Sequence, residues 1–212
     1  MTDLIAAEWI KFRTDRSTTG VLAVLLVVVL LALPLAGSRP MARALLPVVQ
    51  TCLATLGVLA SATEYATGMI ALTGTAMPHR RRHLLAKAVV VAGTCALCAL
   101  LALATVDLVR AGQPTAGLLG MVAAVAVAGV VGLALGVLTR SPGAAFSTLA
   151  VVLFAPSVVA PLVASPWGGR IGALSLPDLS HRPFWTAALG LTGYTLVSLS
   201  AAAVLVHRRD VR

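Results

Sequence analysis

The sequence predicts an all-α membrane protein with six transmembrane helices, preceded by an amphipathic interfacial helix, and with both termini cytoplasmic. Its composition is 59% hydrophobic and 11% charged, with a mean hydropathy of +0.98. Soluble domains carry about 25% charged residues, so this chain has too little polar surface to cover a water-facing globule. Apolar runs of bilayer length divide the chain, and Lys and Arg gather in alternate connections between them.

Six apolar runs are long enough to cross a bilayer, whose hydrocarbon core of roughly 30 Å requires about 20 helical residues. They lie at residues 20–36, 44–62, 84–109, 115–138, 144–164 and 184–206. None shows the alternating polarity of a transmembrane β-strand. The first run is too long and too apolar for a signal-peptide core, and no convincing cleavage site follows it. We therefore expect residues 1–212 to form a single transmembrane domain.

The distribution of basic residues predicts the orientation of these spans. With the N-terminus inside, eleven of the sixteen Lys and Arg residues fall in inner segments and five in outer segments. Such an inner excess is the usual determinant of orientation. The net charge of +9 is assigned to this role, because aromatic residues are only 4% of the chain and no basic stripe is interleaved with them, as nucleic-acid binding requires.

Residues 1–18 are predicted to form an interfacial helix before the first span. Apolar residues recur there at steps of four and three residues: Ile5, Trp9 and Phe12. Another face carries charges that are spaced closely enough to pair: Glu8, Lys11 and Asp15. This pattern is typical of a helix lying along the inner interface, with Trp9 at headgroup depth. The alternative is a solvated extension whose periodicity arises by chance.

Residues 63–83 form the long polar connection expected on the cytoplasmic side. They combine a carboxylate, flexible glycines, apolar side chains and a basic cluster. This mixture is suited to a surface that contacts a soluble partner. The candidate contact residues are Glu64, Tyr65, Gly68, Met69, Ile70, Leu72, Arg80, Arg81 and Arg82. The alternative is a plain inner loop whose arginines only set the orientation.

Two features lie inside the predicted spans. Small residues at four-residue steps, namely Ala124, Ala128, Gly132 and Gly136, form a smooth ridge that lets helix backbones approach closely, either within one subunit or between two. Pro156 and Pro161 are expected to kink the fifth span. A broken helix of this kind is a candidate gate, and an ordinary kinked helix is an equally good interpretation.

The sequence carries none of three common motifs for catalysis or cofactor binding. The chain has no GxxxxGK[ST] phosphate loop, no HExxH zinc motif and no GxSxG nucleophile elbow. Cys95 and Cys98 have CxxC spacing within an apolar run, but no second pair completes a metal site. We therefore expect no enzymatic activity, and no cofactor or metal site, on this chain.

Three stretches resemble the permease subunits of type-2 ATP-binding-cassette (ABC) exporters, particularly the short bacterial ones. They are the N-terminal segment Ala6–Thr18, the segment Thr63–Ala88 with its Glu-Tyr pair, basic patch and Ala-Lys pair, and the ending His207–Arg212. The six-span plan of that family is similar to the plan predicted here over essentially the whole chain.

The resemblance implies half of a transport pathway in the bacterial cell membrane. Two permease subunits, identical or related, would pair with two separately encoded ATPase subunits that hold ATP and Mg²⁺. The loop from Glu64 to about residue 76 would form a coupling helix that docks on the ATPase, and transport would follow an alternating-access cycle. The alternative is a multi-pass scaffold or immunity protein that transports nothing and binds no ATPase.

Overall fold

In the computed structural model, residues 2–32, 39–68, 80–109, 118–163 and 184–209 are described, and all of their regular structure is helical. The α-helices are α1 (Thr2–Thr14), α2 (Arg16–Ala32), α3 (Arg39–Ala66), α5 (Arg80–Val109), α6 (Leu118–Thr139), α7 (Pro142–Val159) and α10 (Phe184–Arg209). A 3-10 turn, η2 (Ala160–Leu162), follows α7. The predicted all-helical class is confirmed for these residues.

Two helical segments in the described part of the chain, His83–Val106 and Leu118–Thr139, are long and apolar enough to cross a membrane. A third crossing results if Ile5–Thr14 and Arg16–Leu31, which meet at a bend of 69°, count as one broken span. Pro142–Pro156 and Gly190–Val204 are shorter apolar helices. Each of the six predicted runs overlaps a helix, whereas the crossing of a membrane at all six stays a prediction.

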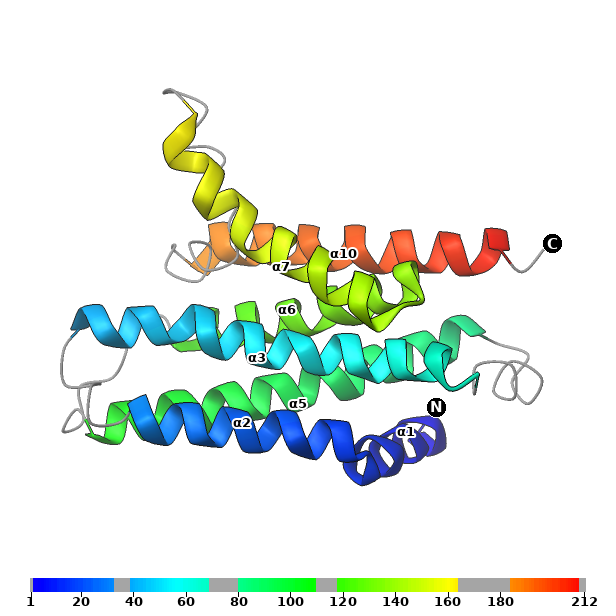
Figure 1. The fold of residues 1–212 in the computed structure, drawn as a ribbon, viewed down its shortest axis with the longest axis horizontal. Helices are drawn as coiled ribbons and strands as arrows, with labels where there is room; N and C mark the ends of the chain where they lie inside the picture. The colour runs from blue at the N-terminus through cyan, green and yellow to red at the C-terminus, as the bar shows by residue number, and fades with distance from the viewer. Residues whose placement is uncertain (1, 33–38, 69–79, 110–117, 164–183, 210–212) are drawn as a thin grey trace.

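Helices α2, α3, α5, α6, α7 and α10 alternate in direction along the chain (Figure 1). The last turns of α3, α6 and α10 lie at the same end of the bundle as α1 and the first turns of α5 and α7. Glu64, in the last turn of α3, therefore lies at this end of the bundle. Residues 69–79, which connect α3 to α5, are outside the described residues.

Helices α3 and α6 form the closest contact in the bundle. A Cβ atom added to Gly57 of α3 would overlap the backbone carbonyl oxygen of Gly129 in α6. Gly132 lies nearly as close to the Ala54 carbonyl oxygen of α3, and Gly136 lies against the Ser61 side chain and the Val58 carbonyl oxygen. The ridge with Ala124 and Ala128, both about 0–1% exposed, therefore packs against α3 of the same chain, the first of the two arrangements that the sequence left open.

Helix α1 is set at an angle to the bundle by a break at Asp15. The Asp15 carboxylate accepts a hydrogen bond from the backbone N–H of Ser17, 3.1 Å away, and so caps the start of α2. The chain bends by 69° at this point. Helix α1 thus ends at Thr14, whereas the predicted interfacial helix extended to residue 18.

The two prolines of the predicted gate have different surroundings. Pro156 lies inside α7 and is half-buried, whereas Pro161 is exposed in the 3-10 turn that ends the helix. Figure 1 shows this end of α7, drawn in yellow, pointing away from the other helices. A gating role for either proline stays a prediction, and residues 164–183, which follow, are outside the described residues.

Candidate functional site

The Glu64 carboxylate lies at the centre of an ion-pair cluster formed by three helices. One of its oxygens pairs with Lys11 Nζ of α1 and the other with Lys87 Nζ of α5. The Glu64 and Lys87 side chains are 8% and 6% exposed, whereas that of Lys11 is 38% exposed. This differs from the sequence interpretation, which placed Glu64 in an exposed loop beginning at residue 63 with its charge available to a partner.

The position of Glu64 is explained by one helical turn by which α3 extends beyond the predicted span. Because α3 continues to Ala66, Ala60 and Glu64 are four residues apart and lie on the same face. Lys87 contacts both, donating a hydrogen bond of 3.1 Å to the Ala60 carbonyl oxygen and pairing with the Glu64 carboxylate. The bonds satisfy an ammonium group that would otherwise be costly to bury.

Glu8 of α1 completes the cluster from the other side of Lys87. Its carboxylate lies 3.6 Å from Lys87 Nζ and 3.5 Å from His83 Nδ1. Two carboxylates therefore face two ammonium groups, so the cluster is electrically balanced when His83 is neutral. Helix α1 contributes Glu8 and Lys11 to it, which ties this helix to both α3 and α5.

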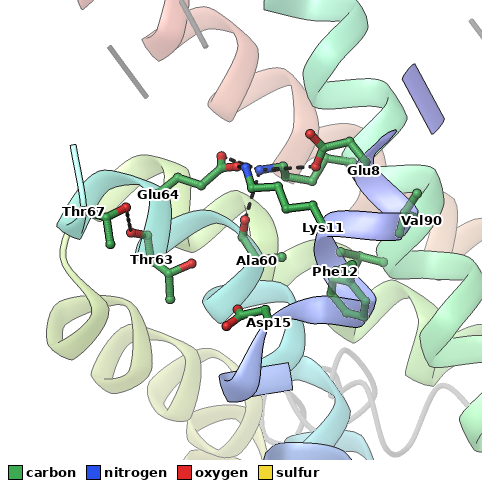
Figure 2. Close-up of a pocket in the computed structure, with 11 residues that line it drawn as sticks. Glu8, Lys11, Phe12, Asp15, Ala60, Thr63, Glu64, Thr67 and Val90 are labelled. Carbon is green, nitrogen blue, oxygen red and sulfur yellow. Dashed lines mark hydrogen bonds and ion pairs between the residues drawn. The ribbon is translucent and has the colours of Figure 1, made fainter. Parts of the chain in front are cut away.

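A cavity of about 180 Å³ lies between α1, α3 and α5 beside this cluster. Figure 2 shows Glu64, Lys11 and Glu8 converging at one side of it, with Asp15 at another. Phe12, Val90 and Val91 give it apolar walls. The cavity places the charges next to apolar side chains, where an unpaired charge would be poorly solvated.

Glu8, Glu64 and His83 also offer ligand atoms that lie within 4.8 Å of one another, as a metal site would require. However, the Glu64 oxygens are already paired with Lys11 and Lys87, and a metal cation would have to displace two ammonium groups. The donor set is therefore better explained as a structural ion-pair network than as a metal centre.

Tyr65, adjacent to Glu64, contacts the opposite half of the bundle. Its ring packs against a small cluster that includes Val137 of α6 and Ala202 of α10. The Arg140 guanidinium lies over the ring, 5.4 Å from its centroid, within the range of a cation–π contact. Glu64 and Tyr65 thus join the end of α3 to α1 and α5 on one side and to α6 and α10 on the other.

The remaining predicted contact residues are divided among three places. Gly68 lies in the turn after α3 with φ +70°, a left-handed conformation that favours glycine. Arg80, Arg81 and Arg82 form the first residues of α5 rather than part of a loop. The apolar residues of the expected coupling helix, Met69, Ile70 and Leu72, lie outside the described residues.

The apolar face predicted for the interfacial helix is divided in the structure. Ile5 and Phe12 pack against the core of the bundle, and Phe12 is only 9% exposed. Trp9 is 43% exposed and lies on another side of α1 together with Ile10, which is 63% exposed. Glu8 and Lys11 face the bundle together with Phe12. The side of α1 that faces the bundle therefore carries both charged and apolar residues.

Sequence reasoning missed Lys11, Lys87, Glu8 and His83 as members of the site. A signal for Lys87 was present, since a lysine within a predicted span marks a paired or functional group by default. It was interpreted as one of the inner positive charges and as part of the Ala-Lys pair in the family resemblance. Glu8 and Lys11 were predicted only to pair within their own helix, and nothing in the sequence gave a comparable signal for His83.

Comparison with known protein families found no family model that matches this chain, and comparison with curated proteins found no match.

Proposed function

We propose that this chain is the permease subunit of a bacterial type-2 ABC exporter, embedded in the cell membrane by six transmembrane helices with both termini inside. It would work with a second permease subunit and a separately encoded ATPase. The resemblance of three sequence stretches suggested this family. The alternating directions of α2, α3, α5, α6, α7 and α10 in Figure 1 are consistent with such a topology.

The observation that carries the proposal is the ion-pair cluster beside residues 69–79. Glu64 lies in the last turns of α3, and His83 and Lys87 lie in the first turns of α5. The segment between these helices is the one proposed to dock on the ATPase. A force on that segment would therefore act first on helix ends that are tied to each other and to α1.

In this mechanism the loop and the cluster have separate roles. Met69, Ile70 and Leu72 would supply the apolar contact with the ATPase, since exposed ion pairs contribute only about 0–1 kcal/mol each. Glu64 would not contact the partner. It would instead hold α1, α3 and α5 together so that closure of the ATPase subunits on ATP moves these helix ends as a unit.

The test is isolation of the intact complex from native membranes in mild detergent, followed by identification of any chain that hydrolyses ATP. We expect an ATPase subunit to co-purify, and Met69→Arg to abolish co-purification while the permease still inserts and folds. Thr19→Arg, a change at an exposed site on α2 outside the loop, is the control and should leave the complex intact. If the wild-type chain retains no ATPase, the scaffold or immunity interpretation replaces this one.

A further inference from the structure

We propose that Arg140 is a positioning residue: its guanidinium, stacked on Tyr65, fixes the last turn of α3 and joins it to the turn that begins α7. The contact is established by geometry, with the guanidinium carbon 5.4 Å from the centroid of the Tyr65 ring. The effect of this contact on a complex with an ATPase subunit rests on the proposed function, whereas the stack itself does not.

Arg140 occupies a backbone position that favours glycine. Its φ is 54°, in the left-handed region, where a residue with a Cβ atom is strained. It immediately follows α6, and its N–H donates a 3.1 Å hydrogen bond to the carbonyl oxygen of Gly136. This is the αL ending of a helix, in which the residue at this position is usually glycine.

The strained backbone aims the side chain and begins the next helix. Ser141 follows in an extended conformation as the N-cap of α7, with Pro142 in the first turn. The left-handed residue therefore makes the sharp reversal between α6 and α7. An arginine there carries the strain that glycine would avoid, and it gains a contact with Tyr65 that glycine cannot make.

Tyr65 transmits this contact to the end of α3. The two residues that follow α3 are hydrogen-bonded back to its last turn. Thr67 donates to the Thr63 carbonyl oxygen through its N–H at 2.9 Å and its hydroxyl at 2.8 Å, and Gly68 N–H donates to that of Tyr65 at 3.3 Å. Both residues are exposed. Fixing the Tyr65 ring thus limits fraying at the point where the chain leaves α3 toward residues 69–79.

Hydrogen exchange on the full chain, purified in detergent, measures this directly. We expect Arg140→Gly to speed exchange in peptides containing the Thr67 and Gly68 amides by about two- to fivefold, the factor that corresponds to one exposed cation–π contact. Arg13→Ala, which removes an exposed arginine of α1, should leave these rates unchanged. Unchanged rates in Arg140→Gly would overturn the proposal.

A double-mutant cycle separates the stack from the packing of Tyr65. Tyr65→Phe retains the ring face and therefore the stack, so Arg140→Gly should speed exchange in this background by about the same two- to fivefold as in the wild type. Tyr65→Leu should speed exchange in the wild-type background by more than in the Arg140→Gly background, because only the former has a stack to lose. Equal effects in both backgrounds would mean that Tyr65 acts only through packing.

The link to α7 is tested on the complex with its ATPase subunit. The Ala145 amide, which donates to the Ser141 carbonyl oxygen at 2.9 Å, reports on the first turn of α7. We expect ATP to change its exchange in the wild-type complex and to change it much less in Arg140→Gly; equal changes would contradict the link. If no ATPase co-purifies, the proposed function fails, while the exchange of Thr67 and Gly68 still decides the stack.

Discussion

The ammonium of Lys87 in α5 pairs with the carboxylate of Glu64 in α3, and both side chains are more than nine-tenths buried. The stability of a buried ion pair depends on whether the attraction between its two charges offsets the cost of removing them from water. Removal of one partner leaves the other charge buried and poorly compensated. The pair therefore makes the two helix ends that flank residues 69–79 dependent on each other.

Glu64→Gln is expected to lower the free energy of unfolding by up to about 3–5 kcal/mol, because it leaves the buried Lys87 ammonium with only the Glu8 carboxylate, 3.6 Å away, as an ionic partner. Thermal or denaturant unfolding of the purified protein in detergent measures the loss. Lys11→Gln is the matched control on the exposed side of the cluster, where a lost pair should cost only about 0–1 kcal/mol. Similar losses for the two variants would contradict the burial assigned to the Glu64–Lys87 pair.

Gly57→Ala is expected to destabilise the bundle by about 1–3 kcal/mol or more, since the added methyl group would overlap the Gly129 carbonyl oxygen. Gly93→Ala is the matched control, because a Cβ atom at that site in α5 meets nothing within 4 Å. It should be neutral or stabilise by up to about 1 kcal/mol through helix propensity. Melting temperatures of the two variants in the same detergent compare them, and equal shifts would exclude the close α3–α6 contact.

Phe12→Ala and Trp9→Ala test which side of α1 faces the bundle. The Phe12 side chain packs against the core, so its truncation should cost about 3–5 kcal/mol of unfolding free energy. Trp9 is 43% exposed, and Trp9→Ala should cost less than about 1 kcal/mol within the chain. A larger loss for Trp9→Ala would reverse the orientation of α1.

The six-span topology predicts that the connections after α5 and after α6 lie on opposite sides of the membrane. In intact cells, an impermeant thiol reagent should label Gly112→Cys and should label Ser141→Cys only after the membrane is opened. The wild-type chain, whose cysteines Cys52, Cys95 and Cys98 lie within helices, gives the background. Labelling of both variants from the outside would exclude a crossing by α6.

Features that depend on local pattern were predictable from the sequence. Composition and run length indicated helices, because a chain with so few charged residues must satisfy its backbone groups internally. The spacing of Gly132 and Gly136 indicated a close helix contact, and the structure adds that the partner is α3.

The ion-pair cluster was not predictable in the same way. Lys11 and Glu64 are 53 residues apart, and Lys87 contacts Ala60 across 27 residues. Their meeting depends on the bend at Asp15, which turns α1 back onto the bundle, and on the last turns of α3, which convert a predicted loop residue into a helical one. Single-sequence patterns specify neither the angle between helices nor the residue at which a helix ends.

The backbone contacts that Gly57 and Gly132 allow between α3 and α6 have a mechanical consequence. Where Gly132 lies against the backbone of Ala54, the helices cannot slide past each other by changing side-chain rotamers, so α3 and α6 are expected to move as one rigid body. Any change of shape that the protein undergoes must then come from the helices around this pair. A spectroscopic distance measured between labels on α3 and α6 should stay constant in every state of the working cycle, while distances from α6 to α2 or α7 vary.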